Sequence, residues 1–306
     1  MPRLPWAGAL ALALLPAWAQ ACSICGCGDP LLAAGSARPM AGQLRLSIDA
    51  EYLYATARSD DNPAATESLD QETLKAILVY SPSRSLALVL QAPFPRKDWW
   101  TNDPGEPLQA TANTGLGDVE LGARWFLWQG LDLQEARSQD LALSLGTSLP
   151  SGPSDLTVDG ERIDQHAQLG TGAVGPYAGL LYGLNHVDWS LSASATFRGR
   201  ATNAQGYQYG QSLGFGLDSQ WRMIKSLALT LGLDGRYADH DHDWAAGELA
   251  TETGGTVLAL TPGLGWEWGE GLGLIGWVQL PVYANLFGVQ GVSPTYHIGL
   301  QYLFSL

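Results

Sequence analysis

The stretch from Tyr296 to Leu306 shows most clearly a pattern that runs through the chain. Large apolar side chains occupy every second position, and mostly small or polar residues stand between them. Successive side chains of a β-strand point to opposite faces, so this alternation predicts a strand with one apolar face and one polar face. Stretches of this kind recur about twelve times from Gln43 onward, separated by turns.

Twelve strands are predicted in this way. They cover residues 43–56, 72–81, 86–94, 117–128, 139–149, 172–183, 186–198, 208–223, 226–238, 255–268, 271–283 and 294–305. Short turns alternate with longer loops, which is typical of outer-membrane barrels with short periplasmic turns and long external loops. The connection 129–139 is longer than a turn should be and is the weakest point of the count. The pattern predicts an all-β, transmembrane, antiparallel up-and-down β-barrel of about twelve strands over residues 43–306.

Aromatic residues stand near the ends of the predicted strands, where a membrane interface would lie. They are Tyr52, Tyr54, Trp125, Trp128, Trp266 and Trp268. Amphipathic rings favour the headgroup level of a membrane. The alternative is core packing in a soluble sandwich, which would need a second sheet and would have exposed edges to protect.

The first 21 residues have the features of a secretory signal. Arg3 is a positive n-region, residues 7–15 are apolar, and small residues suit cleavage after residue 19 or 21. Residues 22–42 then form a cysteine-containing segment that we expect on the periplasmic side or tucked into the lumen. A secreted chain with barrel patterning belongs in the outer membrane of a Gram-negative bacterium, in contact with its lipid.

Charged residues fall on the polar faces of the predicted strands. An arginine facing lipid at the membrane midplane costs about 2–4 kcal/mol, so we expect these side chains to line the lumen. They are Arg45, Asp49, Glu51, Asp118, Glu120, Arg124, Asp188, Asp218, Arg222, Asp234, Arg236 and Glu267. Many other inward positions are Gly, Ser or Ala, which favours a narrow pore.

The net charge of −14 argues against nucleic acid as a partner. Several acids, including Asp60, Asp61, Glu67 and Asp70, fall in predicted external loops. There they are expected to be solvated or bridged by divalent cations.

All three cysteines, Cys22, Cys25 and Cys27, follow the signal within six residues. Thiolates prefer soft ions, so they could hold Cu(I) or Zn and serve a periplasmic metal or redox partner. Three alternatives stay open: a disulfide between two of them, a lipid on Cys22, or docking of a periplasmic partner without metal. No cofactor is certain.

The loop 239–243 alternates Asp with His240 and His242. It could be a solvated acidic loop, a divalent-cation site, or an Asp–His pair that activates water, as in omptin-type outer-membrane proteases. The last reading needs partner carboxylates, for which Asp103 and Asp155 are available. The sequence therefore does not predict an enzyme.

Five glycine-rich segments resemble, in the same order, the outer-membrane family named for the meta-pathway of phenol degradation. They are residues 115–125, 149–152, 169–172, 203–210 and 280–283. The resemblance implies a barrel with a transport role and transfers no binding residues. We expect an outer-membrane channel for small solutes, with soft-metal handling at the cysteines. The alternatives are an omptin-like hydrolase and a closed structural or partner-docking barrel.

Overall fold

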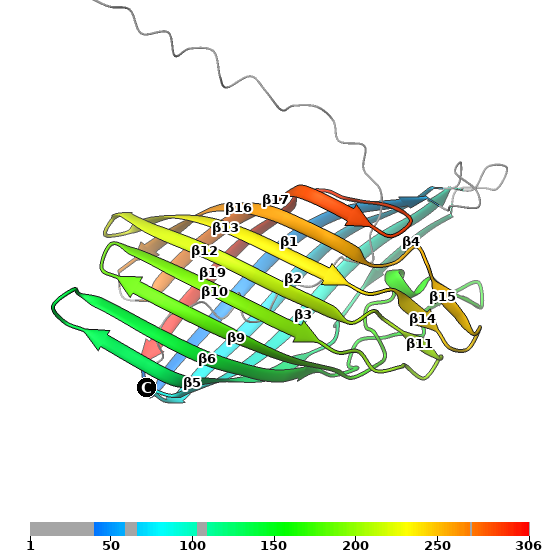
Figure 1. Cartoon of the computed structure of the whole chain (residues 1–306). Helices are drawn as coiled ribbons and strands as arrows, with labels where there is room; N and C mark the ends of the chain where they lie inside the picture. Colours follow the sequence, from blue (N-terminus) through cyan, green and yellow to red (C-terminus); the bar gives the residue numbers. More distant parts are fainter. Residues whose placement is uncertain (1–39, 59–65, 103–108, 270, 306) are drawn as a thin grey trace, which may run out of the picture.

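The computed structural model describes residues 40–58, 66–102, 109–269 and 271–305. It contains a closed antiparallel barrel of twelve strands (Figure 1). The barrel strands are β1 (Gln43–Arg58), β2 (Thr66–Ser83), β3 (Leu86–Asn102), β5 (Glu120–Asp132), β6 (Arg137–Ser148), β9 (Gly175–His186), β10 (Trp189–Arg198), β12 (Ser212–Ile224), β13 (Leu227–Ala238), β16 (Gly255–Trp268), β17 (Leu272–Leu286) and β19 (Thr295–Ser305). Each strand pairs with its neighbours along the chain, and β19 closes the ring on β1. The predicted fold class and strand number are confirmed.

The two ends of the barrel differ, as the spacing of the strands predicts. Short turns gather at one end, near the C-terminus, and long connections gather at the other (Figure 1). The long connections carry the small elements β4 (Gln109–Thr114), β7 (Thr157–Val158), β8 (Glu161–Arg162), η1 (Gln165–Ala167), β11 (Tyr207–Gln208), β14 (Asp241–Asp243), β15 (Glu248–Ala250) and β18 (Val289–Val292). By the usual topology of such barrels, the long-loop end is external. Within the described part of the chain, no helix is long and apolar enough to span a membrane.

Two segments that the sequence assigned to connections are strand. Strand β5 continues to Asp132 and β6 begins at Arg137, so 129–139 contains only a short turn. A bulge between Phe126 and Trp128 shifts the alternation of apolar and polar residues there, so the sequence does not show that β5 continues past it. Strand β2 begins at Thr66 and pairs with β3 up to Asn102, so Glu67 and Asp70 lie in a strand rather than in a loop. Asp60 and Asp61 lie outside the described residues.

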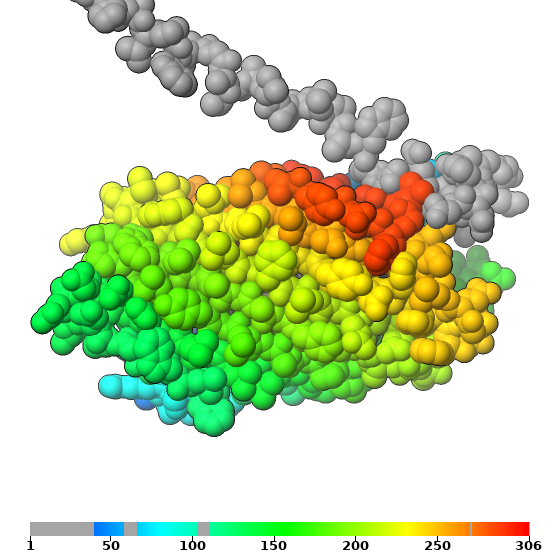
Figure 2. Space-filling model, viewed as in Figure 1, coloured from blue at the N-terminus to red at the C-terminus, as the bar shows by residue number. Residues whose placement is uncertain are grey.

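The outer wall of the barrel is apolar, as a lipid-facing surface requires. Outward positions along each strand carry large exposed side chains, for example Leu231 and Leu233 on β13. Figure 2 shows one side of this wall as a continuous surface of packed strands. Of the aromatic residues near strand ends, Trp125 is 58% exposed and Trp266 packs beside Trp268.

The lumen is less polar than the sequence suggests. An apolar cluster of buried side chains covers the inner wall of five neighbouring strands toward the turn end. It consists of Ile77, Val79, Ala87, Phe126, Ala142 and Leu181. On strands β2, β3, β5, β6 and β9, these inward side chains pack against one another. This cluster fills that side of the lumen near the turns.

Candidate functional site in the lumen

Two cavities lie in the described part of the barrel. The outer cavity, of about 330 Å³, lies toward the long loops, and the inner cavity, of about 230 Å³, lies at the turn end. The predicted lumen residues divide between them. Five line the outer cavity: Glu51, Asp118, Glu120, Asp234 and Arg236. Three line the inner cavity: Asp188, Arg222 and Glu267.

The remaining four predicted residues lie on inward positions of the strands. They are Arg45, Asp49, Arg124 and Asp218. Asp49 and Arg124 are almost fully buried, at 5% and 3% exposure. Asp118 precedes β5 and Asp188 lies in the turn before β10, so these two are not strand residues as expected. Whether solutes pass along any of these groups stays a prediction.

The strand register places a band of polar side chains at the floor of the outer cavity. Along the ladder, Gln91 pairs with Glu120, and Glu120 pairs with Ser148. Further along, Tyr177 pairs with Arg198. Together with Lys75 of β2 these inward residues form what we call the polar belt: Lys75, Gln91, Glu120, Ser148, Tyr177 and Arg198. All of them are buried. On strands β2 to β9, the apolar cluster lies between the belt and the turn end of the barrel.

Arg198 is held at two points in the belt. Its Nη1 donates to Glu120 Oε1 at 2.6 Å and its Nη2 donates to Oε2 at 3.5 Å. Its guanidinium carbon also lies 5.2 Å from the centre of the Tyr177 ring. A guanidinium that is paired with a carboxylate and stacked on an aromatic face has one defined orientation.

Two glycines seat the Tyr177 ring. The tyrosine hydroxyl lies where a Cβ on Gly146 of β6, the strand beside β9, or on Gly122 of β5, the next strand, would stand. Only glycine leaves this space, so the ring lies flat across β6 and β5. The glycines therefore fix the support on which Arg198 rests.

A second ion pair lies on the opposite side of Gln91. Lys75 Nζ donates to Glu51 Oε2 at 2.8 Å, and the two side chains are 3% and 11% exposed. The register sets Asp49 beside Lys75 as well. Below this pair, Asp49 Oδ2 is 3.6 Å from His297 Nε2. Both cations of the belt, Lys75 and Arg198, are thus paired with a carboxylate.

The connection 149–174 folds into the mouth of the barrel and narrows it. Lys97 of β3 donates to the carbonyl oxygens of His166 and Gln168, at 2.8 and 2.6 Å. The Gln168 side chain is 1% exposed and bonds to the backbone of Leu156 and Ile163, which ties the connection to itself. The backbone carbonyls that a loop would otherwise bury unpaired are thereby satisfied.

Asp118 fastens the base of the same connection. Its carboxylate accepts from the backbone N–H groups of Gly152 and Thr171, and from the Thr171 hydroxyl at 2.6 Å. Gly152 and Gly170 lie so close that neither position has room for a Cβ. This explains the glycines of the short motifs in 149–152 and 169–172.

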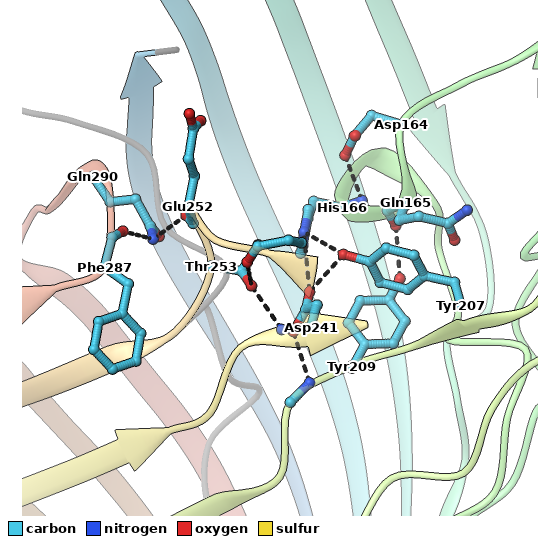
Figure 3. Close-up of polar contacts among 12 residues, drawn as sticks. Asp164, Gln165, His166, Tyr207, Tyr209, Asp241, Glu252, Thr253, Phe287 and Gln290 are labelled. Atoms are coloured by element: carbon cyan, nitrogen blue, oxygen red, sulfur yellow. Dashed lines mark hydrogen bonds and ion pairs between the residues drawn. The ribbon is translucent and has the colours of Figure 1, made fainter. Parts of the chain in front are cut away.

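Three external connections meet at a group that we call the loop latch: His166, Tyr207, Tyr209 and Asp241 (Figure 3). Asp241 is 3% exposed and accepts from the Tyr207 hydroxyl and from the Gly210 N–H, each at 2.7 Å. His166 Nε2 lies 3.4 Å from Asp241 Oδ2. The Tyr209 hydroxyl donates to the Gln165 carbonyl at 2.8 Å.

Both tyrosines of the latch have altered acidity. Burial raises the pKa of Tyr207, and the neighbouring Asp241 carboxylate raises it further. Burial likewise raises the pKa of Tyr209, with Asp241 and Asp164 adding to it. Both hydroxyls therefore remain donors at neutral pH, and the narrowing connection stays tied to the rest of the mouth.

Of the proposed metal ligands, His240 and His242 lie in the described part of the chain, and each stacks on an aromatic ring. The rings of His240 and Phe287 stack at 4.1 Å, and those of His242 and Trp244 at 5.1 Å. Among the described residues, no group of three or more His, Cys, Asp or Glu is arranged to hold a metal. Asp155 is exposed. Asp103, Cys22, Cys25 and Cys27 lie outside the described residues, so metal binding at the cysteines stays a prediction.

The sequence reasoning missed several residues of the site. Lys75 and Arg198 stand at inward positions by simple alternation, so the same rule that found Asp49 would have found them. Gln91 and Tyr177 carry no charge and give no such signal. His166 and Asp241 are far apart in the sequence, and only the fold brings them together.

The fold and its lumen define the class of this protein: a transmembrane β-barrel of the Gram-negative outer membrane. The model of the family described as "Putative MetA-pathway of phenol degradation" matches residues 56–290, and the chain belongs to that family. A search of curated proteins found no match.

Two solved structures resemble the barrel. An outer membrane channel from Pseudomonas putida F1 is 13% identical and has a TM-score of 0.62, with 88% of this chain and 98% of that chain covered. The transport unit of the autotransporter AIDA-I from Escherichia coli is 12% identical and has a TM-score of 0.50, with 88% and 92% covered. At these identities the likeness shows the fold.

Proposed function

We propose that this barrel is a channel for small polar or zwitterionic solutes, which pass one at a time beneath the inward connection and across the polar belt. The observation that carries the proposal is an outer cavity lined by charges of both signs inside a closed barrel. Such groups select solutes by pore size, local field and hydrogen bonding. The channel from Pseudomonas putida F1 supports the same reading through its fold.

Single-channel recording in a planar bilayer tests this proposal. We expect discrete conductance steps from the purified protein. A barrel that stays ion-tight would contradict it and would favour a closed structural or partner-docking role.

An outer-membrane hydrolase is the competing function, and the Asp–His pair at the external loops that could serve it is Asp241 with His166. In the loop latch, Asp241 also receives the Tyr207 hydroxyl and the Gly210 N–H, so it holds loops together. This arrangement favours a positioning role. Peptidase activity that disappears in His166→Ala would favour the hydrolase instead.

We also propose, from the sequence, that Cys22, Cys25 and Cys27 bind Cu(I) or Zn for the channel or a periplasmic partner. Native mass spectrometry of the mature protein, purified without reducing agent, tests this. Bound metal that is lost when all three cysteines are changed to Ser supports it. A mass two protons light without metal means a disulfide, and a diacylglyceryl mass on Cys22 means a lipid anchor; either result replaces the metal proposal.

A further inference from the structure

Gln91 has a buried amide nitrogen that no described residue satisfies. The side chain is 1% exposed and contributes to the wall of the outer cavity. Its Nε2 has no hydrogen-bond partner among the residues that the structure describes. Burying an amide group without a partner is unfavourable, and proteins normally supply one from water or a ligand. The belt therefore contains a buried donor, in a residue that lines the outer cavity, without a partner in the described part of the chain.

Charges of both signs surround this donor. The register places Glu120 opposite Gln91 on β5, and Glu120 holds Arg198. On the other side, Gln91 pairs with Ile77, two residues from Lys75, which holds Glu51. The two ion pairs together carry no net charge. Both signs of charge therefore stand beside this donor, and a solute with one charge of each sign finds a partner for both.

The size and walls of the outer cavity fit one small molecule. Its volume of about 330 Å³ is at the lower end of the range of roughly 300–1,000 Å³ for small-molecule sites. Pro93 and Pro95 of β3 stand above Gln91 on the inner wall and have no N–H to offer a solute. Between Gln91 and Lys97, the inward side chains of β3 therefore offer a solute no hydrogen-bond donor.

We propose that the polar belt binds a small zwitterionic solute of amino-acid size during its passage. The solute carboxylate accepts a hydrogen bond from Gln91 Nε2. The solute ammonium donates to the carboxylate of Glu120, which stands opposite Gln91 on β5. This inference rests on the proposed channel function and names the class of solute at that site.

Solute flux into proteoliposomes tests the proposal with the full chain. Glycine is compared with glycolamide, a neutral molecule of nearly the same size. We expect glycine flux to exceed glycolamide flux and to saturate with concentration. Gln91→Leu, which keeps the volume and removes the amide, should lower the glycine to glycolamide ratio roughly tenfold, because hydrogen bonds to charged groups are among the stronger ones.

Two further variants complete the test. Gln220→Leu, which changes a glutamine of the inner cavity, should leave the ratio unchanged. Gln91→Glu keeps the shape and adds a negative charge that repels the carboxylate, so it should also lower the ratio. Heat-modifiable migration on gels identifies which variants are folded barrels.

The outcomes separate this inference from the channel function. Equal flux of glycine and glycolamide, unaffected by either Gln91 variant, would overturn the zwitterion site and leave the channel in place. No flux of either solute would overturn the channel function and the inference with it.

Discussion

Glu120 and Arg198 are 78 residues apart in the sequence and lie on β5 and β10, with two strands between them, yet Arg198 Nη1 is 2.6 Å from Glu120 Oε1. The Tyr177 ring on the intervening strand β9 supports the guanidinium. The pair therefore ties four strands together on their inner face. The Arg198 side chain is 11% exposed and the Glu120 side chain 7%, so the pair contributes to stability as a buried ion pair.

Removing one member of this pair should destabilise the barrel. Glu120→Leu leaves the Arg198 charge without its carboxylate and should lower the free energy of unfolding by about 3–5 kcal/mol. The double variant Glu120→Leu and Arg198→Met should recover most of that loss, because no charge is then buried. Urea unfolding in detergent, followed by tryptophan fluorescence, measures both. Equal losses in the single and double variants would contradict this role.

The glycines beneath Tyr177 should not tolerate a side chain. Gly146→Ala pushes the ring from its seat and should cost about 1–3 kcal/mol of unfolding free energy, as overpacking does. Adding Tyr177→Leu should relieve part of the cost. Gly214→Ala on β12 is the matched control, since the nearest atom to an added Cβ there is 3.9 Å away. Unfolding midpoints that fall equally in Gly146→Ala and Gly214→Ala would show that the ring is not seated this way.

The loop latch should limit both conductance and protease access. Asp241→Leu removes the acceptor for Tyr207 and Gly210, so the connection 149–174 should move more freely. We expect a higher single-channel conductance and faster trypsin cleavage after Arg162. Asp243→Asn, on the same hairpin, keeps the latch and serves as the control. Unchanged cleavage and conductance in Asp241→Leu would mean that the connection is held without the latch.

Alkaline pH should open the latch, because Tyr207 and Tyr209 have pKa values above the usual value of about 10. The folded state holds these protons more tightly than the unfolded state does. Their contribution to stability is therefore complete below pH 10 and declines as the pH rises above it. Absorbance at 295 nm during an alkaline titration should show these two tyrosines ionising at a lower pH in the double variant with Asp241→Asn and Asp164→Asn than in the unchanged protein. Burial, the larger cause, still keeps both pKa values raised in that variant. Identical titration curves would argue against the proximity of these carboxylates.

An arginine should destabilise the barrel on its lipid-facing wall but not at an external loop. Leu231→Arg on β13 should lower stability in lipid by about 2–4 kcal/mol, because the guanidinium would face hydrocarbon. Val158→Arg, at an exposed external loop, should change it by less than about 0.5 kcal/mol. Folding titrations into bilayers of defined thickness provide the measurement. A similar effect at both positions would mean that Leu231 does not face lipid.

Alternation alone was enough to predict the twelve strands, since each lipid-facing position must be apolar. It did not predict how far β2 and β3 extend beyond the membrane, because those segments face water on their outer side and lack apolar alternation. The bulge at Phe126 had a similar effect, because one extra residue reverses the faces that follow it. Regular periodicity is informative only where one face meets lipid.

The candidate site was predictable only in part. Charged inward residues such as Glu120 and Asp234 are visible in the sequence because lipid would exclude them. Their partners depend on strand register and on loops that fold inward, and neither follows from local pattern. Gln91 could not have been singled out, since its significance lies in a missing partner.

The pairing of β19 with β1 has a consequence for biogenesis. Gln43 aligns with Ser305, so the last strand made is the one that seals the first. Until it arrives, β1 and β17 each present an unpaired edge, which is a template for association with other chains. An export intermediate must therefore be held apart from its neighbours until the eleven residues of β19, Thr295–Ser305, have crossed the inner membrane. Truncation within that strand should convert a closed barrel into an aggregating one.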